Sequence, residues 1–180
     1  MIYLFLADGF EEVEALAPLD ILRRAGKEVK TVGVGGDTIC GSHGIPVICD
    51  TTEDKISLAD KPEAVILPGG MPGTLNLEKS KTVCAFARDA FADGRLVCAI
   101  CAAPSVFGHL GLLRGKKATC FPGFEAELDG AEVCADSVCQ DGNVITAKGA
   151  GVALDFGFAI TSALCGADTA KKLSASMQCK

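Results

Sequence analysis

Two cysteines stand three residues apart in LVCAICAAP (96–104), at the end of an apolar run. Their spacing suits a redox disulfide, half of a zinc site, or one reactive thiol beside an inert neighbour. Residues three apart in a strand lie roughly 10 Å apart, whereas a disulfide needs Cα atoms within about 7 Å. No second C-x-x-C and no histidine pair accompanies them. We therefore expect no metal site, with Cys98 in the core and Cys101 acting alone.

Cys101 has the sequence surroundings of a nucleophile elbow. An apolar strand is expected to end at Ile100, and two alanines then lead to Pro104 in the first turn of a helix. Small neighbours are needed because such a turn is tight and projects its side chain outward. Backbone N–H groups and the positive helix end favour a thiolate, so the pattern predicts a lowered pKa for Cys101. A cysteine that only fills space at a strand end remains the alternative.

The segment LPGG (67–70) follows another apolar strand. Its glycines, Gly69 and Gly70, let backbone N–H groups come close to a ligand. Together with the amide of Ala102, they would form an oxyanion hole. An ordinary strand-to-helix turn is the alternative for these residues.

The segment DGFEEVE (8–14) places three glutamates at the start of an expected helix. Such acids usually form a solvated first turn that complements the helix dipole. Glu14 also lies near the end of the preceding strand. A carboxyl group held protonated there beside a thiolate would act as a general acid and base.

Neither histidine is expected to be catalytic. His43 lies in segment 39–49, which we expect to form two short strands at the sheet edge. His109 follows Cys101 by eight residues, about 12 Å along a helix. Both are therefore interpreted as structural or surface residues, which argues against a Cys–His protease or amidotransferase triad.

The apolar pattern predicts strands that alternate with helices. Strands are expected at 2–7, 28–34, 64–70, 96–100 and 117–120, with a hairpin at 137–147, and helices at 11–26, 79–92, 103–113, 151–166 and 168–177. The helix that begins in 103–113 is expected to break near Gly108 and Gly111. Strands that are apolar on both faces indicate a mostly parallel sheet covered on both sides. We therefore predict a single α/β domain over 1–180. The three segments described above end strands, where such folds carry their chemistry.

Composition narrows the function classes. The chain has 180 residues, is 49% hydrophobic and carries a net charge of −6 without a basic run, so neither nucleic acid nor an anionic membrane is an expected partner. The start, MIYLFLADGFEE, lacks the basic region of a signal peptide, and no apolar run reaches the roughly 18 residues of a membrane helix. We expect a cytoplasmic protein whose ten cysteines are mostly small buried hydrophobes.

Four segments in order resemble one protein family across nearly the whole chain: DGFEEVEALAPLDILRRAG, VILPGGMPG, AICAAPSVFGHLGLLRGKKAT and KGAGVALDFGFAI. Together they resemble the ThiJ/PfpI superfamily, in the branch of the parkinsonism-associated protein deglycase (Parkinson disease protein 7) and its bacterial relative YajL. The resemblance implies a flavodoxin-like three-layer sandwich, usually a homodimer, with no required cofactor.

The resemblance also assigns roles to residues. It matches Cys101 to the family's oxidisable elbow cysteine and Glu14 to the partner carboxylic acid. Gly70 and Ala102 match the backbone donors that face the thiol, and Gly69 adjoins them. The alanine after Cys101 separates the chain from the protease and heat-shock branches, which place a histidine there.

Two positions depart from the family pattern. Phe121 in TCFPG stands where a histidine near the nucleophile is common, and His43 in SHG stands where an arginine is common. Both changes concern substrate handling rather than the thiol–carboxyl pair. By its place in the same loop, Cys120 is also expected close to the site, where a resolving-cysteine role is conceivable.

The leading hypothesis is a cofactor-independent enzyme whose Cys101 attacks methylglyoxal, glyoxal, or their early adducts on protein amines and thiols. The rival is a redox-sensing or chaperone-like stress protein that acts through oxidation of Cys101. A third reading, the older family label of thiazole monophosphate (thiamine) biosynthesis, ranks low because no phosphate-binding Gly-rich helix start stands out.

Overall fold

A seven-stranded sheet forms the centre of the protein in this computed structural model, which describes residues 1–179. The strand order is β10-β11-β7-β6-β1-β2-β5. The strands are β1 (Ile2–Leu6), β2 (Val29–Gly33), β5 (Thr51–Thr52), β6 (Ala64–Leu67), β7 (Leu96–Ile100), β10 (Val138–Asp141) and β11 (Val144–Ala147). Only the β10–β11 hairpin is antiparallel, so the predicted mostly parallel sheet is confirmed.

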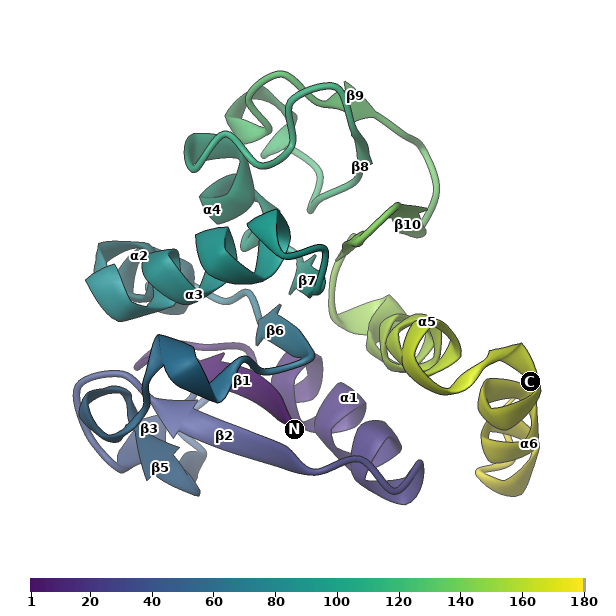
Figure 1. The fold of residues 1–180 in the computed structure, drawn as a ribbon, viewed down its shortest axis with the longest axis horizontal. Helices are drawn as coiled ribbons and strands as arrows, with labels where there is room; N and C mark the ends of the chain where they lie inside the picture. Colours follow the sequence, from purple (N-terminus) through teal and green to yellow (C-terminus); the bar gives the residue numbers. More distant parts are fainter. Residues whose placement is uncertain (180) are drawn as a thin grey trace.

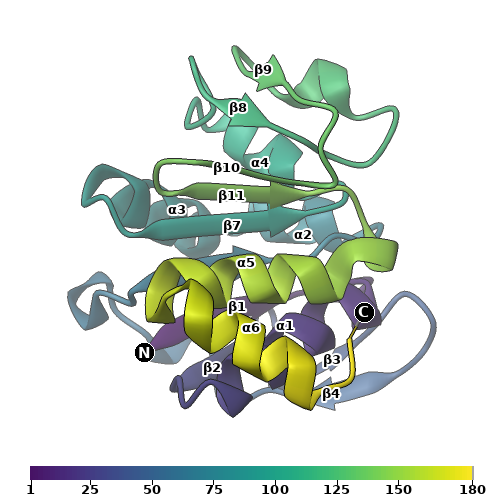
Figure 2. The same cartoon turned by 90° about the vertical axis from the view of Figure 1, so that its right-hand side faces the viewer.

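Helices cover both faces of this sheet (Figures 1 and 2). One face packs against α1 (Glu12–Arg24) and α5 (Ala153–Cys165), with α6 (Ala167–Ser176) packed on α5, and the other against α3 (Lys81–Ala92) and α4 (Pro104–His109). Figure 2 shows α5 and α6 in front of the sheet. The three-layer sandwich expected from the sequence is therefore confirmed.

Strand β7 shows how the alternation of side chains builds two cores. Val97 and Ala99 belong to the cluster on the α3/α4 face, while Cys98 and Ile100 belong to the cluster on the α1/α5 face. All four are fully buried, because both faces of a covered parallel sheet are dry. The strand ends at Ile100, and the elbow begins at the next residue.

Shorter elements lie outside the main sheet. Strands β3 (Thr38–Cys40) and β4 (Pro46–Ile48) form the expected antiparallel pair, and β8 (Lys117–Ala118) pairs in parallel with β9 (Glu132–Val133). Four short 3-10 helices complete the chain: η1 (Glu53–Lys55), η2 (Leu58–Asp60), η3 (Glu125–Glu127) and η4 (Ala150–Val152).

The expected helix at 79–92 differs from the structure. The chain forms a separate helix, α2 (Gly73–Lys79), before α3 begins. Ser80 divides the two because its extended backbone ends α2 and its hydroxyl accepts a hydrogen bond from the Val83 N–H, which caps α3. The helix in 103–113 ends at His109, between Gly108 and Gly111, where the break was expected; Gly111 has a positive φ.

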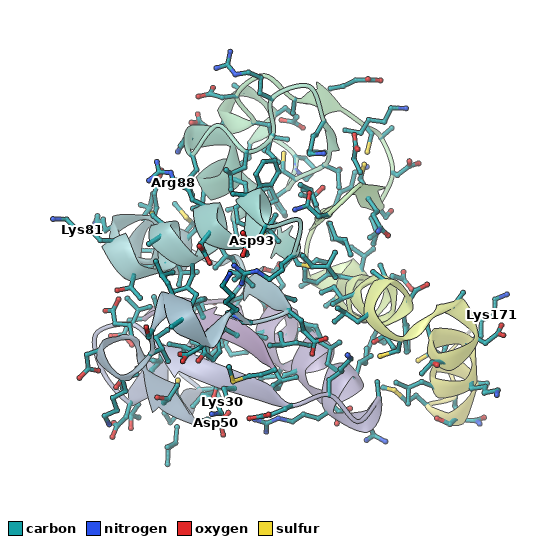
Figure 3. The ribbon with its side chains drawn as sticks, viewed as in Figure 1. Lys30, Asp50, Lys81, Arg88, Asp93 and Lys171 are labelled. Carbon is teal, nitrogen blue, oxygen red and sulfur yellow. The ribbon has the colours of Figure 1, made fainter. Side chains whose placement is uncertain are left out.

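Lysine side chains extend from the surface helices. Figure 3 shows Lys81 on α3 and Lys171 on α6 pointing outward at opposite edges of the molecule. Among residues 1–179, no helix combines the length and the apolar composition that crossing a membrane requires.

Candidate active site

Cys101 occupies a strained turn directly after β7. Its φ of 65° lies in the left-handed region, which a residue with a side chain adopts rarely. The Cys101 N–H donates to the carbonyl of Ala147 at 2.9 Å, and the Phe121 N–H donates to the Cys101 carbonyl at 2.8 Å. These bonds hold the turn from both sides, as a strained functional residue requires. The elbow geometry expected from AICAAP is present.

Glu14 meets Cys101 from the first turn of α1. Glu11 caps this helix by accepting a hydrogen bond from the Glu14 N–H at 2.7 Å. The Glu14 side chain is 1% exposed, and its Oε2 accepts a hydrogen bond from the Gly69 N–H at 3.0 Å. Its carboxyl group is also hydrogen-bonded to the Cys101 thiol and to the backbone N–H of Ala150. The glutamate is thus buried and positioned rather than solvated.

The electrostatics of this pair differ from the expected lowered pKa for Cys101. Burial and the adjacent Glu14 carboxylate raise the pKa of Cys101 to about 12, although the amides of Ala102 and Gly70 lower it. Burial also raises the pKa of Glu14 to about 7. The sequence-based prediction was wrong because desolvation and a negative neighbour outweigh two amides and the short helix α4. Burial and the ionised Glu14 therefore keep Cys101 in its thiol form.

Two glycines shape the space around the thiol. A Cβ atom at Gly69 would lie 2.6 Å from the Cys101 Cβ and 2.7 Å from the Glu14 Oε2, so only glycine fits between them. Gly70 has a φ of 88°, which favours glycine, and its N–H is directed at the Cys101 thiol together with that of Ala102. The structure thus gathers the predicted donors around one sulfur atom.

Phe121 borders the same space. It is 47% exposed, and a ring atom lies 3.3 Å from where a Cβ of Gly149 would stand. The Glu14 Oε1 lies 3.7 Å from that same point. An exposed aromatic ring therefore stands at the mouth of the site.

Cys120 directly precedes Phe121, whose N–H binds the Cys101 carbonyl, but its side chain enters a different core. It is buried in the cluster on the α3/α4 face, whereas Cys101 packs against the cluster on the α1/α5 face. The Cys120 side chain lines a separate cavity together with Cys134 and Lys148. Consecutive residues at 120 and 121 thus face different surroundings.

His43 pairs with Glu12 rather than Glu14. Its N–H donates to the Glu12 Oε1 at 2.7 Å, and its Nδ1 lies 2.8 Å from the Glu12 Oε2. Burial raises the pKa of Glu12, but hydrogen bonds from His43 and the backbone N–H of Ile45 outweigh this and hold it at about 2. Together with Glu11, these residues form the one group in the described chain with spacing suited to a metal ion. Glu12 and His43 are hydrogen-bonded to each other, whereas Glu11 accepts from the Glu14 N–H.

Cys98 and His109, which were predicted to take no part in the chemistry, lie where expected. Cys98 is fully buried, and Cys98 and Cys101 are both free thiols. His109 lies between Glu78 and Glu127, with its Nε2 2.9 Å from the Glu127 Oε2, and these carboxylates raise its pKa.

Sequence reasoning missed two contributors to the site. The Glu11 carboxylate accepts a hydrogen bond from the Glu14 backbone N–H. The backbone N–H of Ala150 interacts with the Glu14 carboxyl group. The signal for the second was the segment KGAG (148–151), where glycines flank Ala150. A glycine pair at a strand end indicates close approach of the backbone, as it does at LPGG.

Comparisons with known proteins agree with this architecture. Residues 1–163 match the DJ-1/PfpI family. Protein DJ-1 homolog B of Arabidopsis thaliana is 36% identical over 174 residues, which cover 94% of this chain but 39% of that longer protein. Deglycase PH1704 of Pyrococcus horikoshii is 36% identical over 150 residues, covering 81% of this chain and 88% of the relative.

The solved structures support the same assignment. The oxidized DJ-1 of Toxoplasma gondii superposes with a TM-score of 0.95 at 29% identity, covering 99% of this chain and 97% of that one. Sequence match and fold agree over nearly all of the residues that build the sheet and the elbow. The chain belongs to the DJ-1/PfpI family.

Proposed function

We propose that the protein is a cysteine-dependent enzyme of the glyoxalase or deglycase type, acting on methylglyoxal, glyoxal or their early adducts. The observation that carries this proposal is the position of Cys101 beside the buried Glu14 carboxyl group: the Cys101 Cβ and the Glu14 Oε2 lie 2.6 Å and 2.7 Å from the point that a Cβ of Gly69 would occupy. A nucleophile in contact with a group that titrates near neutral pH has the two functions that aldehyde chemistry requires. The name of the deglycase relative from Pyrococcus horikoshii supports the same class.

With methylglyoxal, the Cys101 sulfur bonds to the aldehyde carbon. The thiol proton passes through Glu14 to the former carbonyl oxygen, which gives a hemithioacetal. The Gly70 and Ala102 amides, which point at the sulfur, would stabilise the oxygen while it is negative. No cofactor is needed for this step.

Glu14 then moves a second proton. It takes the hydrogen of the former aldehyde carbon as a proton and returns one to the neighbouring carbon, through an enediol. One carbon is oxidised and its neighbour reduced, so no external oxidant is required. Water cleaves the resulting lactoyl thioester, which releases lactate and restores the thiol.

The test is lactate production from methylglyoxal by the wild type and by Cys101→Ser. We expect the variant to lose essentially all turnover, because a serine hydroxyl in a buried site is a far weaker nucleophile at neutral pH. Cys49→Ser is the matched control, since Cys49 is buried in the same α1/α5 cluster and away from the elbow. Full lactate production by Cys101→Ser would sink the proposal.

A redox role for Cys101 is the second candidate. Glu14 with a pKa of about 7 carries a proton in part of the population at neutral pH, and a carboxylic acid in contact with an oxidised cysteine would donate a hydrogen bond to it. Mild peroxide followed by mass analysis separates the two roles: addition of two oxygens at Cys101 without aldehyde turnover favours sensing. The homodimer and the cytoplasmic location stay predictions.

A further inference from the structure

The loop between β9 and β10 brings two further thiols together. Cys134 follows β9, and Cys139 lies five residues later in β10. Thr146, which pairs with Cys139 across the β10–β11 hairpin, accepts a hydrogen bond from the Thr119 N–H at 2.9 Å. The adjacent Ala118 carbonyl accepts one from the Cys134 N–H, so the two cysteines lie side by side. Both are free thiols, and neither belongs to the Cys101–Glu14 pair.

Hydrogen bonds fasten the loop that joins the two cysteines. The Cys134 N–H donates to the Ala118 carbonyl at 2.9 Å, which holds one end of the loop against β8. The Lys148 ammonium donates to the Ala135 carbonyl at 2.6 Å, and the Lys148 N–H donates to the Ser137 carbonyl at 3.0 Å. These hydrogen bonds hold the backbone of the loop at both Cys134 and Ser137.

The two cysteines differ in access. Cys134 is partly exposed and lines a cavity of about 250 Å³, whereas Cys139 is 6% exposed. Reaction with an oxidant in solution follows exposure and thiolate character, so Cys134 is the residue that an oxidant reaches first. Burial and the neighbouring Cys134 raise the pKa of Cys139 to about 12, which keeps it a protonated thiol. The pair therefore divides into an attacking and a resolving cysteine.

We propose that Cys134 and Cys139 form a second redox site, a reversible disulfide made by hydroperoxides independently of Cys101. The Cys134 thiolate attacks the peroxide oxygen and becomes a sulfenic acid, releasing water or an alcohol. The Cys139 sulfur then displaces hydroxide from that sulfenic sulfur, and its own proton converts the hydroxide to water. Two electrons leave the two thiols and reduce one hydroperoxide. Because the closed loop is short, the bond constrains the unfolded chain only modestly, as suits a reducible site.

The sequence offers a direct test. Cleavage before Asp129, Asp136 and Asp141 yields peptides 129–135 and 136–140, with one cysteine each. Wild type and Cys101→Ala are treated with hydrogen peroxide, remaining thiols are alkylated, and the digest is analysed with and without reduction. We expect the two peptides to appear linked, lighter by two hydrogen atoms than their sum, and to separate on reduction in both proteins.

Variants of single cysteines identify which two thiols form the disulfide. Cys134→Ser and Cys139→Ser should each abolish the linked species, while Cys49→Ser should keep it. A Cys120–Cys134 link, or a Cys134 sulfinate beside alkylated Cys139, would overturn the proposal. Because the wild-type digest alone decides between these products, a variant that fails to fold does not weaken the test. Survival of the link in Cys101→Ala separates this site from the proposed catalytic one.

Discussion

Glu12 and Glu14 lie two residues apart in the first turn of α1, and their side chains are 5% and 1% exposed. Yet the pKa of Glu12 is held at about 2, while that of Glu14 is raised to about 7. Glu12 accepts hydrogen bonds from His43 and its neighbourhood, which stabilise the ionised carboxylate. Glu14 faces a thiol and one further acid, Glu11, so burial prevails.

The difference shows that burial alone does not set the protonation of a carboxyl group. The donors supplied by other segments decide it. The segment 38–48 supplies these donors to Glu12, where they lower the pKa by more than burial raises it. At Glu14, burial and the neighbouring Glu11 outweigh the Cys101 thiol and the Gly69 and Ala150 amides, which leaves a group able to exchange protons near neutral pH.

The largest expected difference is between the turnover of a Glu14 variant and that of a Glu12 variant. Glu14→Gln keeps the shape but cannot carry a proton to and from substrate, so we expect turnover of methylglyoxal to fall by about 10²- to 10⁴-fold. Glu12→Gln should leave turnover nearly unchanged. The wild-type rate should also show a limb near pH 7, given the pKa of Glu14, and Glu14→Gln should lack it. An equal loss of turnover in Glu14→Gln and Glu12→Gln would contradict a catalytic role for Glu14 alone.

The second test adds a methyl group at the glycine that lies beside each acid. Gly69→Ala would place a Cβ 2.6 Å from the Cys101 Cβ, whereas Gly41→Ala would place one 2.2 Å from the Glu12 Oε1. We expect Gly69→Ala to lower turnover by about 100-fold, because a misplacement of about 1 Å suffices for such a loss. Gly41→Ala should loosen the segment 38–48 and lower the midpoint of thermal unfolding without a comparable loss of turnover. Wild-type turnover in Gly69→Ala would contradict the close packing at the elbow.

His43→Ala should have the smallest effect. The pKa of Glu12 is lowered from 4.5 to about 2 in the folded chain, so its contribution to stability is present above about pH 4.5 and lost as the pH falls toward 2. Removing His43 takes away part of this lowering. The acid limb of a urea-unfolding series should then move to higher pH, while turnover stays at the wild-type level. An unchanged acid limb would show that the backbone donors alone hold Glu12.

Much of the fold was predictable because its signals are local. Runs such as IYLFL and LVCAI are apolar at every position, which only a strand covered on both faces requires, and the helices between them carry recognisable ends. Helix α2 escaped prediction because its seven residues follow a Pro–Gly segment that reads as a loop. Strands β5 and β9 have two residues each, too few for any periodicity.

The candidate site was predictable to the level of residue types and family resemblance. Cys101 followed from the strand-to-helix turn, and Glu14, Gly70 and Ala102 from the resemblance. The direction of the Cys101 pKa did not follow, because it depends on how deeply the turn is buried and on the charge beside it. Which of the two cores receives the Cys120 side chain also depends on the face of the sheet that it enters.

By itself, the sequence determined the layered sheet, the elbow at Cys101 and the membership of Cys98 in the core, since these follow from the alternation of apolar residues and from small residues at a tight turn. Only the tertiary structure decided that Glu12 is satisfied by His43, that burial raises the pKa values of Cys101 and Glu14, and that Cys134 lies beside Cys139. Those outcomes depend on donors and neighbours brought from distant segments, and no local pattern encodes such contacts.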